Sequence, residues 1–124
     1  MIVLDYQDRR PIYEQVTDKF QILILNGILP PGSQMPSVRQ LATELSVNPN
    51  TIQRAYMELE KLGLIYPVKG RGNFVADSSQ VQKINRESYQ KEFAALIQKG
   101  RNTGFSRSEL EKMMAEIFEK EDES

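Results

Sequence analysis

Two helix-start signals stand eleven residues apart in the chain, and they limit the fold more than any other feature. Ser37-Val38-Arg39-Gln40 has the pattern of a capping box, in which the serine oxygen accepts a hydrogen bond from a free N–H at a helix start. Asn48-Pro49 is the second signal, with asparagine as the cap and proline as the first helical residue. Only Ser46-Val47 separates the two helices, so the spacing predicts a helix-turn-helix.

The segment before this motif predicts one further helix. It is expected to begin at Pro11 and to end at Gly27, because proline suits a first helical turn and glycine suits a helix end. Its apolar residues recur at near-helical spacing at Ile12, Val16, Phe20 and Leu23. The helix that starts at Asn48-Pro49 is expected to run to Leu62 and to stop at Gly63. Together with the helix that starts at Ser37, the sequence predicts three helices in a row.

A β-hairpin is expected to follow the three helices. Leu64–Val68 and Asn73–Ala76 have the composition of two short strands around the turn Lys69–Gly72. Pro67 has no N–H to donate to a strand ladder, so the first strand is expected at an edge or to be irregular. Three helices followed by a hairpin are the order of a winged helix-turn-helix. The expected fold class is therefore mainly α with a small β-hairpin.

The residue types that are missing exclude much of enzyme chemistry. The 124 residues contain no His and no Cys, which rules out Ser-His-Asp and Cys-His catalysis, disulfides, and histidine or thiolate metal sites. Carboxylate or lysine chemistry stays open, but an enzyme is disfavoured, and we expect no cofactor and no metal. No run of about 18 apolar residues is present. We therefore expect a cytoplasmic protein with no signal peptide and no membrane partner.

The third helix has a polar face without carboxylates in its first half. At about 100° per residue, its apolar face consists of Ile52, Ala55, Tyr56, Leu59 and Leu62. The opposite face holds Asn50, Arg54, Met57 and Lys61, with Gln53 at its flank. Amides, a hydroxyl and a guanidinium can hydrogen-bond to base edges, and no acid repels phosphate before Glu58. This pattern favours a helix that enters a DNA major groove, with an ordinary solvated face as the alternative.

The charge distribution agrees with a DNA-facing surface although the net charge is −1. Residues 1–76 contain eight basic and seven acidic residues, for +1, and residues 77–124 contain eight and ten, for −2. Between residues 67 and 76 the only charges are Lys69 and Arg71, and between residues 45 and 57 the only charge is Arg54. Phosphate is met by one face of a protein, so these acid-free segments matter more than the sum.

The chain is expected to divide near Asp77–Gln80, a polar stretch of linker character, into a domain of residues 1–76 and a helical region of residues 77–124. Two helices are expected in that region, with a turn at Gly100–Gly104 and a second capping box at Ser106–Glu109. Their apolar stripes contain Phe93, Leu96 and Ile97, then Leu110, Met113, Met114, Ile117 and Phe118. Two helices are too short to bury both stripes alone, so a second copy of the chain is expected to cover them. Packing back onto the winged domain is the alternative.

Five blocks of sequence, taken in order, resemble the GntR family of bacterial transcriptional regulators. They are residues 11–16, 29–42, 47–56, 59–65 and 70–75, and the resemblance covers roughly residues 5–76. The remainder is too short for a metabolite-binding or aminotransferase-like domain. In this respect the chain is similar to the YtrA-like subfamily, in which two helices after the winged domain serve dimerisation.

The resemblance implies roles for individual residues. Arg39, in the block Pro-Ser-x-Arg-x-Leu-Ala, matches an arginine that meets DNA from the second helix. The recognition-helix positions, where family members contact bases and phosphates, are Asn48, Asn50, Thr51, Gln53 and Arg54. Gly70 and Arg71, next to Lys69, match a wing tip that enters the minor groove. We assign Arg54 to a base contact and leave Arg39 open between a base and a phosphate.

These observations predict a sequence-specific regulator of transcription, a repressor that binds an inverted-repeat operator in double-stranded DNA as a homodimer. The alternative is a winged-helix module that contacts other proteins and does not recognise DNA sequence. A regulator of this kind is expected in the bacterial cytoplasm, on the nucleoid when it occupies its operator. The sequence does not identify a small-molecule effector.

Overall fold

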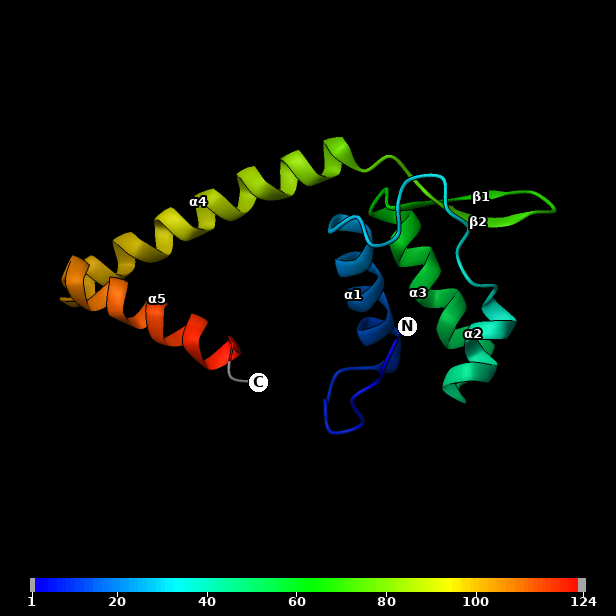
Figure 1. The fold of residues 1–124 in the computed structure, drawn as a ribbon, viewed down its shortest axis with the longest axis horizontal. Coiled ribbons are helices and arrows are strands. Elements are labelled where there is room, and N and C mark those ends of the chain that lie inside the picture. The colour runs from blue at the N-terminus through cyan, green and yellow to red at the C-terminus, as the bar shows by residue number, and fades with distance from the viewer. Residues whose placement is uncertain (1, 123–124) are drawn as a thin grey trace. The chain divides into compact units, whose positions relative to one another are not determined.

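The computed structural model describes residues 2–122, and in that part of the chain five helices and one two-stranded sheet follow one another (Figure 1). In chain order they are α1 Ile12–Leu25, α2 Val38–Leu45, α3 Pro49–Lys61, β1 Ile65–Val68, β2 Gly72–Val75, α4 Ser79–Thr103 and α5 Arg107–Asp122. The chain divides into two compact units, Met1–Lys83 and Ile84–Ser124. The first unit has the three helices and the hairpin of a winged helix, which confirms the expected fold class.

Both helix starts of the helix-turn-helix are capped by the side chain that the sequence predicts. Ser37 Oγ accepts a hydrogen bond over 3.1 Å from the backbone N–H three residues on, and Asn48 Oδ1 accepts one over 2.8 Å from the N–H two residues on. Between the two helices the chain turns at Ser46, whose φ of 56° lies in the left-handed region. The N–H of Val47 donates to the carbonyl of Ala42 over 3.0 Å. The turn that sets α3 against α2 is therefore held by side-chain caps and backbone bonds together.

The boundaries of α3 lie within one residue of those expected, whereas α1 ends at Leu25, two residues before the expected Gly27. Pro11 stands just before the first helical residue of α1, with φ −52° and ψ 147°, rather than inside it. Gly27, just past the end of α1, has φ +75°, a conformation that glycine adopts without a clash of a Cβ atom. The expectation that Leu62 belongs to the core face is wrong, because it is the end cap of α3 and 43% of its surface is exposed.

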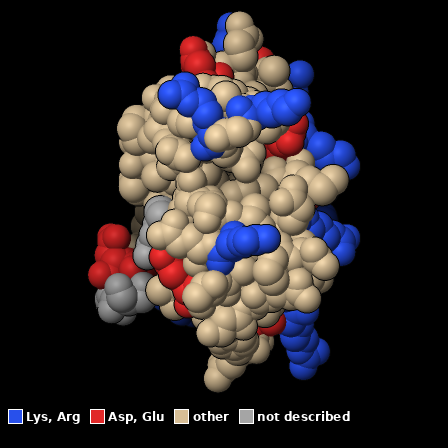
Figure 2. All heavy atoms as spheres, turned by 90° about the vertical axis from the view of Figure 1, so that its right-hand side faces the viewer, with Lys and Arg blue, Asp and Glu red and all other residues tan. Residues whose placement is uncertain are grey.

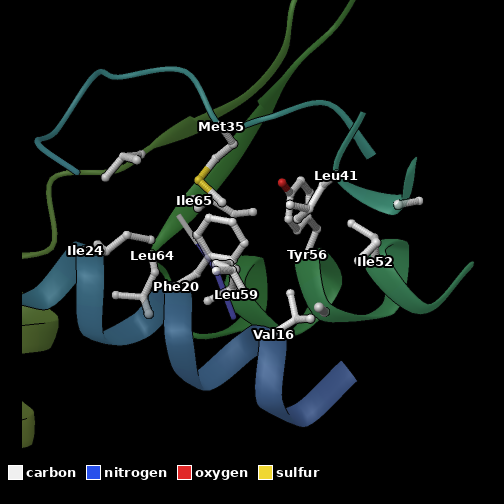
Figure 3. Close-up of a cluster of buried hydrophobic side chains, with 14 residues drawn as sticks. Val16, Phe20, Ile24, Met35, Leu41, Ile52, Tyr56, Leu59, Leu64 and Ile65 are labelled. Carbon is white, nitrogen blue, oxygen red and sulfur yellow. The ribbon is translucent and has the colours of Figure 1, made fainter. Parts of the chain in front are cut away.

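The core of the first unit lies among α1, α2, α3 and the hairpin (Figure 3). Its largest fully buried side chains are Tyr56, Phe20, Leu41, Ile52, Leu59, Leu64, Val16 and Val75. The rings of Phe20 and Tyr56 meet edge to face, with centroids 5.8 Å apart. Because α3 buries this apolar face, the polar face that begins with Asn50 is left outward.

The hairpin is joined by a third backbone segment that the sequence did not reveal. β1 and β2 pair antiparallel, as expected. Along the other edge of β2 runs Gly32–Met35, where the N–H of Met35 donates to the carbonyl of Asn73 over 2.8 Å. The N–H of Val75 donates to the carbonyl of Ser33 over the same distance. β2 therefore has backbone partners on both sides, which ties the wing to the segment that leads into α2.

The first turn of α4 belongs to the first unit. Asp77 Oδ1 accepts a hydrogen bond from the N–H of Ser79 over 3.1 Å, so the expected linker contains a capped helix start. This bond lowers the pKa of the Asp77 carboxyl below its usual value, because it favours the charged form. Gln82 Nε2 donates to the carbonyl of Leu25 over 3.0 Å, and Val81 packs against the core. These contacts explain why the compact unit extends beyond the strands.

The expected end of α4 at Gly100 is wrong, because the helix continues to Thr103. The left-handed position is taken by Gly104, with φ +106°. Gly100 stays helical, and its lack of a side chain makes room for Leu110, since a Cβ atom there would lie 3.1 Å from Leu110 Cδ2. The turn between α4 and α5 is therefore shorter than the sequence suggested.

α5 begins with a complete capping box, as predicted. Ser106 Oγ accepts a hydrogen bond from the N–H of Glu109, and Glu109 Oε1 accepts one from the N–H of Ser106, each over 3.1 Å.

Within residues 2–122, no helix has an apolar stretch long enough to cross a membrane.

Candidate nucleic-acid interface

The start of α3 presents the polar side chains that the sequence singled out. Asn48, Asn50, Gln53 and Arg54 are exposed, and Thr51 is half-buried. Four of them share an open hollow of about 580 Å³ with residues from the start of α1. The lining residues are Pro11, Ile12, Tyr13, Val47, Asn48, Asn50, Thr51 and Arg54. The fold thus brings amides, a hydroxyl and a guanidinium together at the N-terminal end of one helix, where free N–H groups and the helix dipole favour an anion.

Arg54 lies on an aromatic ring rather than on a carboxylate. Its Cζ atom is 3.8 Å from the centroid of the Tyr13 ring in α1, which is the geometry of a cation–π contact. The first acid on α3 is Glu58, and its Oε1 atom lies 3.7 Å from Nζ of Lys61 in the same helix. Arg54 takes part in no salt bridge among residues 2–122.

Arg39 lies in the first turn of α2 and is exposed. The Ser37 cap holds the start of this helix, two residues before Arg39. In the described part of the chain, Arg39 also has no salt-bridge partner. Its guanidinium is therefore available to an outside acceptor, but it lies outside the hollow at the start of α3.

The wing tip is a tight turn whose backbone is held from outside the hairpin. The N–H of Arg71 donates to the carbonyl of Val68 over 2.9 Å, and Gly70 has φ +78°, as the third residue of a type II turn requires. Gln34 Nε2 donates to the carbonyl of Arg71 over 2.8 Å. Lys69 and Arg71 are exposed at this tip. The turn therefore displays two cations on a fixed backbone.

The hairpin tip and α2 lie on the side of Figure 1 that Figure 2 turns toward the viewer. Lys and Arg side chains project from several places on this face, and much of the surface between them is neutral. A surface of this kind suits a polyanion better than the net charge of −1 suggests.

Two residues that help to shape this surface were missed at the sequence level. Tyr13 and Gln34 were recognised only as parts of the sequence blocks 11–16 and 29–42. Each contacts a predicted DNA-binding residue from another element, 41 positions away for Tyr13 with Arg54 and 37 for Gln34 with Arg71. No local periodicity or motif encodes such pairs, because they depend on how the elements pack.

The second unit carries apolar side chains that it does not bury. Within their described residues, α4 and α5 contain no buried residue. Leu96, Ile117 and Phe118 are each 64% exposed. Phe93, Met113 and Met114 are also exposed, whereas Ile97 and Leu110 are half-buried. These eight residues were predicted to form a dimer interface, and we call them the apolar tail face.

Among the described residues, no cluster of three or more Asp or Glu side chains is placed to hold a metal ion. The exposed acids of the second unit are engaged locally or spread along its helices. Arg107, for example, donates through Nε to Glu111 Oε1 over 2.8 Å, and this bond raises the pKa of the guanidinium.

Known proteins similar to this chain are regulators of transcription. The HTH-type transcriptional repressor YtrA of Bacillus subtilis (strain 168) is 42% identical over 84 residues, which is 68% of this chain and 65% of that protein. The chain thus matches slightly less than two thirds of the length of that relative. The match spans 84 residues of this chain, whereas the hairpin ends at Val75. The similarity therefore extends beyond the winged helix.

Solved structures share the fold. A GntR family transcriptional regulator from Listeria monocytogenes is 33% identical with a TM-score of 0.70, and the match covers 94% of this chain and 98% of the other. The DNA-binding part of AraR, solved in complex with operator ORR3, is 32% identical with a TM-score of 0.53, covering 61% and 92%.

The comparison with protein families agrees with the similar sequences and with the similar structures. Residues 12–75, more than half of the chain, match the family described as bacterial regulatory proteins, gntR family. The matched segment runs from the first residue of α1 to the last residue of β2. The chain therefore belongs to the gntR family of bacterial regulatory proteins.

Proposed function

We propose that this chain is a transcriptional repressor that binds an inverted-repeat operator in double-stranded DNA as a homodimer. The observation that carries the proposal is the polar start of α3, which displays Asn48, Asn50, Gln53 and Arg54 with no acid among them. This set sits on the second helix of a helix-turn-helix in a gntR-family chain. The relatives are regulators and not enzymes, in keeping with a binding role.

In the proposed complex, the N-terminal half of α3 enters the major groove. Asn50 and Gln53 can hydrogen-bond to adenine, and Arg54 can donate two N–H groups to guanine. Arg39 lies on α2, the helix that crosses the backbone in such complexes, and donates to a phosphate or a base. Arg71 and Lys69 at the wing tip reach the minor groove or its phosphates, where a guanidinium finds a negative potential.

The structure of AraR with its operator supports this arrangement by similarity of fold. The name of YtrA as a repressor supports the direction of regulation. A protein that covers promoter DNA stops transcription by occlusion, which requires no effector and no further domain. We therefore assign no ligand, and we expect the protein in the cytoplasm with the chromosome.

The apolar tail face supports the homodimer. A single copy leaves Leu96, Ile117 and Phe118 mostly in water, and a second copy of the same helices would remove them from it. Removal of apolar surface from water is a main driving force of protein–protein association. A two-fold axis between two copies places two winged units on related half-sites, which is why an inverted repeat is expected.

The experiment uses the full chain to select duplexes from a random-sequence library. Nuclease footprinting then maps the region that the protein protects on the duplex that it binds best. The expected result is a protected region with two inverted half-sites, and two chains per duplex by titration. The control for non-specific binding is a duplex with the scrambled sequence of the selected one, measured at physiological salt. Equal affinity for both duplexes contradicts the proposal and favours a winged helix that contacts protein instead.

A further inference from the structure

Near their N-terminal ends, α1 and α3 are joined by a cation–π contact. The guanidinium carbon of Arg54 lies 3.8 Å from the centroid of the Tyr13 ring, close enough for direct stacking. Both residues line the hollow at the start of α3. Because α1 is not part of the helix-turn-helix, this contact brings a third helix to the surface that faces DNA in the proposed function.

The ring of Tyr13 is itself fixed in place. It is half-buried and packs against the hydrophobic core, so it is a rigid platform for the exposed guanidinium. Its hydroxyl lies 3.4 Å from Glu14 Oε1, and this carboxylate forms no salt bridge with Arg54. The contact between the two residues is thus made by the ring.

Stacking on a ring and pairing with a carboxylate leave an arginine in different states. A carboxylate occupies the N–H groups at the edge of the guanidinium, whereas a ring covers only its flat face. A stacked arginine is therefore ordered and keeps its in-plane donors free. An ordered side chain also loses less rotamer freedom when it binds, which lowers the free-energy cost of the complex.

We propose that Tyr13 is a positioning residue for DNA recognition, which holds Arg54 so that its N–H edge faces an acceptor on the DNA. The inference rests on the proposed function and adds a residue outside the helix-turn-helix to it. Its contribution passes through Arg54 and requires the aromatic ring but not the hydroxyl.

The test is a double-mutant cycle on a duplex selected with the wild-type chain. Tyr13→Leu removes the ring and should weaken binding by about 3- to 10-fold, the range expected for one side chain that must be ordered on binding. Tyr13→Phe keeps the ring and should bind within about twofold of wild type. In the Arg54→Ala background, Tyr13→Leu should cause no further loss, because the residue it positions is gone.

Two results of this cycle would overturn the inference. Equal losses for Tyr13→Phe and Tyr13→Leu would mean that the hydroxyl contacts DNA. Additive losses in the double variant would mean that Tyr13 acts independently of Arg54. A wild-type chain that binds the selected and the scrambled duplex equally well contradicts the proposed function itself, and the inference with it.

A second measurement does not depend on how well the Leu variant folds. In the wild-type chain, protons of the Arg54 side chain should show upfield ring-current shifts in NMR spectra, both free and bound to the duplex. Tyr13→Phe should retain these shifts. Their disappearance in the wild-type complex would show that the stack breaks on binding, which contradicts a positioning role.

Discussion

At the scale of a single residue, Tyr56 connects three parts of the winged unit. It belongs to α3, its ring meets Phe20 of α1 edge to face, and its hydroxyl donates to the carbonyl of Pro36, just before α2, over 2.7 Å. Tyr56→Phe keeps the ring and leaves that carbonyl without its donor. We expect a loss of about 1–2 kcal/mol in the free energy of unfolding, measured by urea titration with circular dichroism. Tyr66→Phe, at an exposed position on the wing, is the matched control and should have little effect.

The same residue predicts an alkaline dependence of stability. Burial raises the pKa of Tyr56 above its ordinary value of 10.0, with a smaller contribution from Glu44. Above about pH 10 the unfolded chain therefore loses this proton before the folded chain does, so the free energy of unfolding falls with rising pH. In Tyr56→Phe this part of the slope should be missing. An identical slope in the two proteins would assign the alkaline loss to other groups.

Single residues also show where sequence reasoning ends. The caps at Ser37 and Asn48 were predictable, because each bonds to an N–H two or three residues away. The exposure of Asn50 and Arg54 followed from the angular position of the core residues on the same helix. The stack of Arg54 on Tyr13 was not predictable, because it depends on the way in which α1 packs against α3.

At the scale of an element, α5 is stabilised at its start by the capping box of Ser106 and Glu109. Ser106→Ala removes the acceptor for one of the free N–H groups and should cost about 1 kcal/mol. Hydrogen exchange of the first α5 amides should become roughly fivefold faster, since local opening follows this free energy. Ser108→Ala is the control, because that exposed residue lies inside the helix and not at its cap. Equal acceleration in both variants would show that the cap contributes nothing special.

Elements also differ in how well local sequence defines them. Two glycines, Gly100 and Gly104, each suited the end of α4, and the choice between them depends on the packing of Leu110 of α5 beside Gly100. The pairing of Gly32–Met35 with β2 was not predictable from the sequence, because β2 lies about forty positions further along the chain. Hydrogen bonds within a few residues are encoded locally, whereas pairings between distant segments are not.

At the scale of the whole molecule, the apolar tail face should hold two copies together. A chain cut after Lys83 retains the complete first unit and should stay folded, but it should sediment as a monomer. Its affinity for the selected duplex should fall by about 10²–10⁴, because the second half-site contact is no longer intramolecular. A truncated chain that still dimerises, or that binds as tightly as the intact protein, would contradict this role of the tail.

A substitution in the full chain separates loss of the interface from loss of the tail. Ile117→Asp places a carboxylate on the apolar tail face at a site that is 64% exposed in one chain, so it should not unfold the monomer. It should shift the sedimentation profile toward the monomer, because a buried unpaired charge is costly. Lys112→Asp introduces the same side chain at another exposed position on α5 and should leave the dimer intact.

The pairing of Gly32–Met35 with β2 also determines which edge of the sheet is open to other molecules. Because Gly32–Met35 bonds to one edge of β2 and β1 to the other, the outer edge of β1 is the side of the sheet that no described strand covers. An open edge can add strands from other molecules and start aggregation. Here that edge contains Pro67, which has no N–H to offer to an incoming strand. The wing is therefore a poor template for an incoming strand and can stay extended in water at high protein concentration.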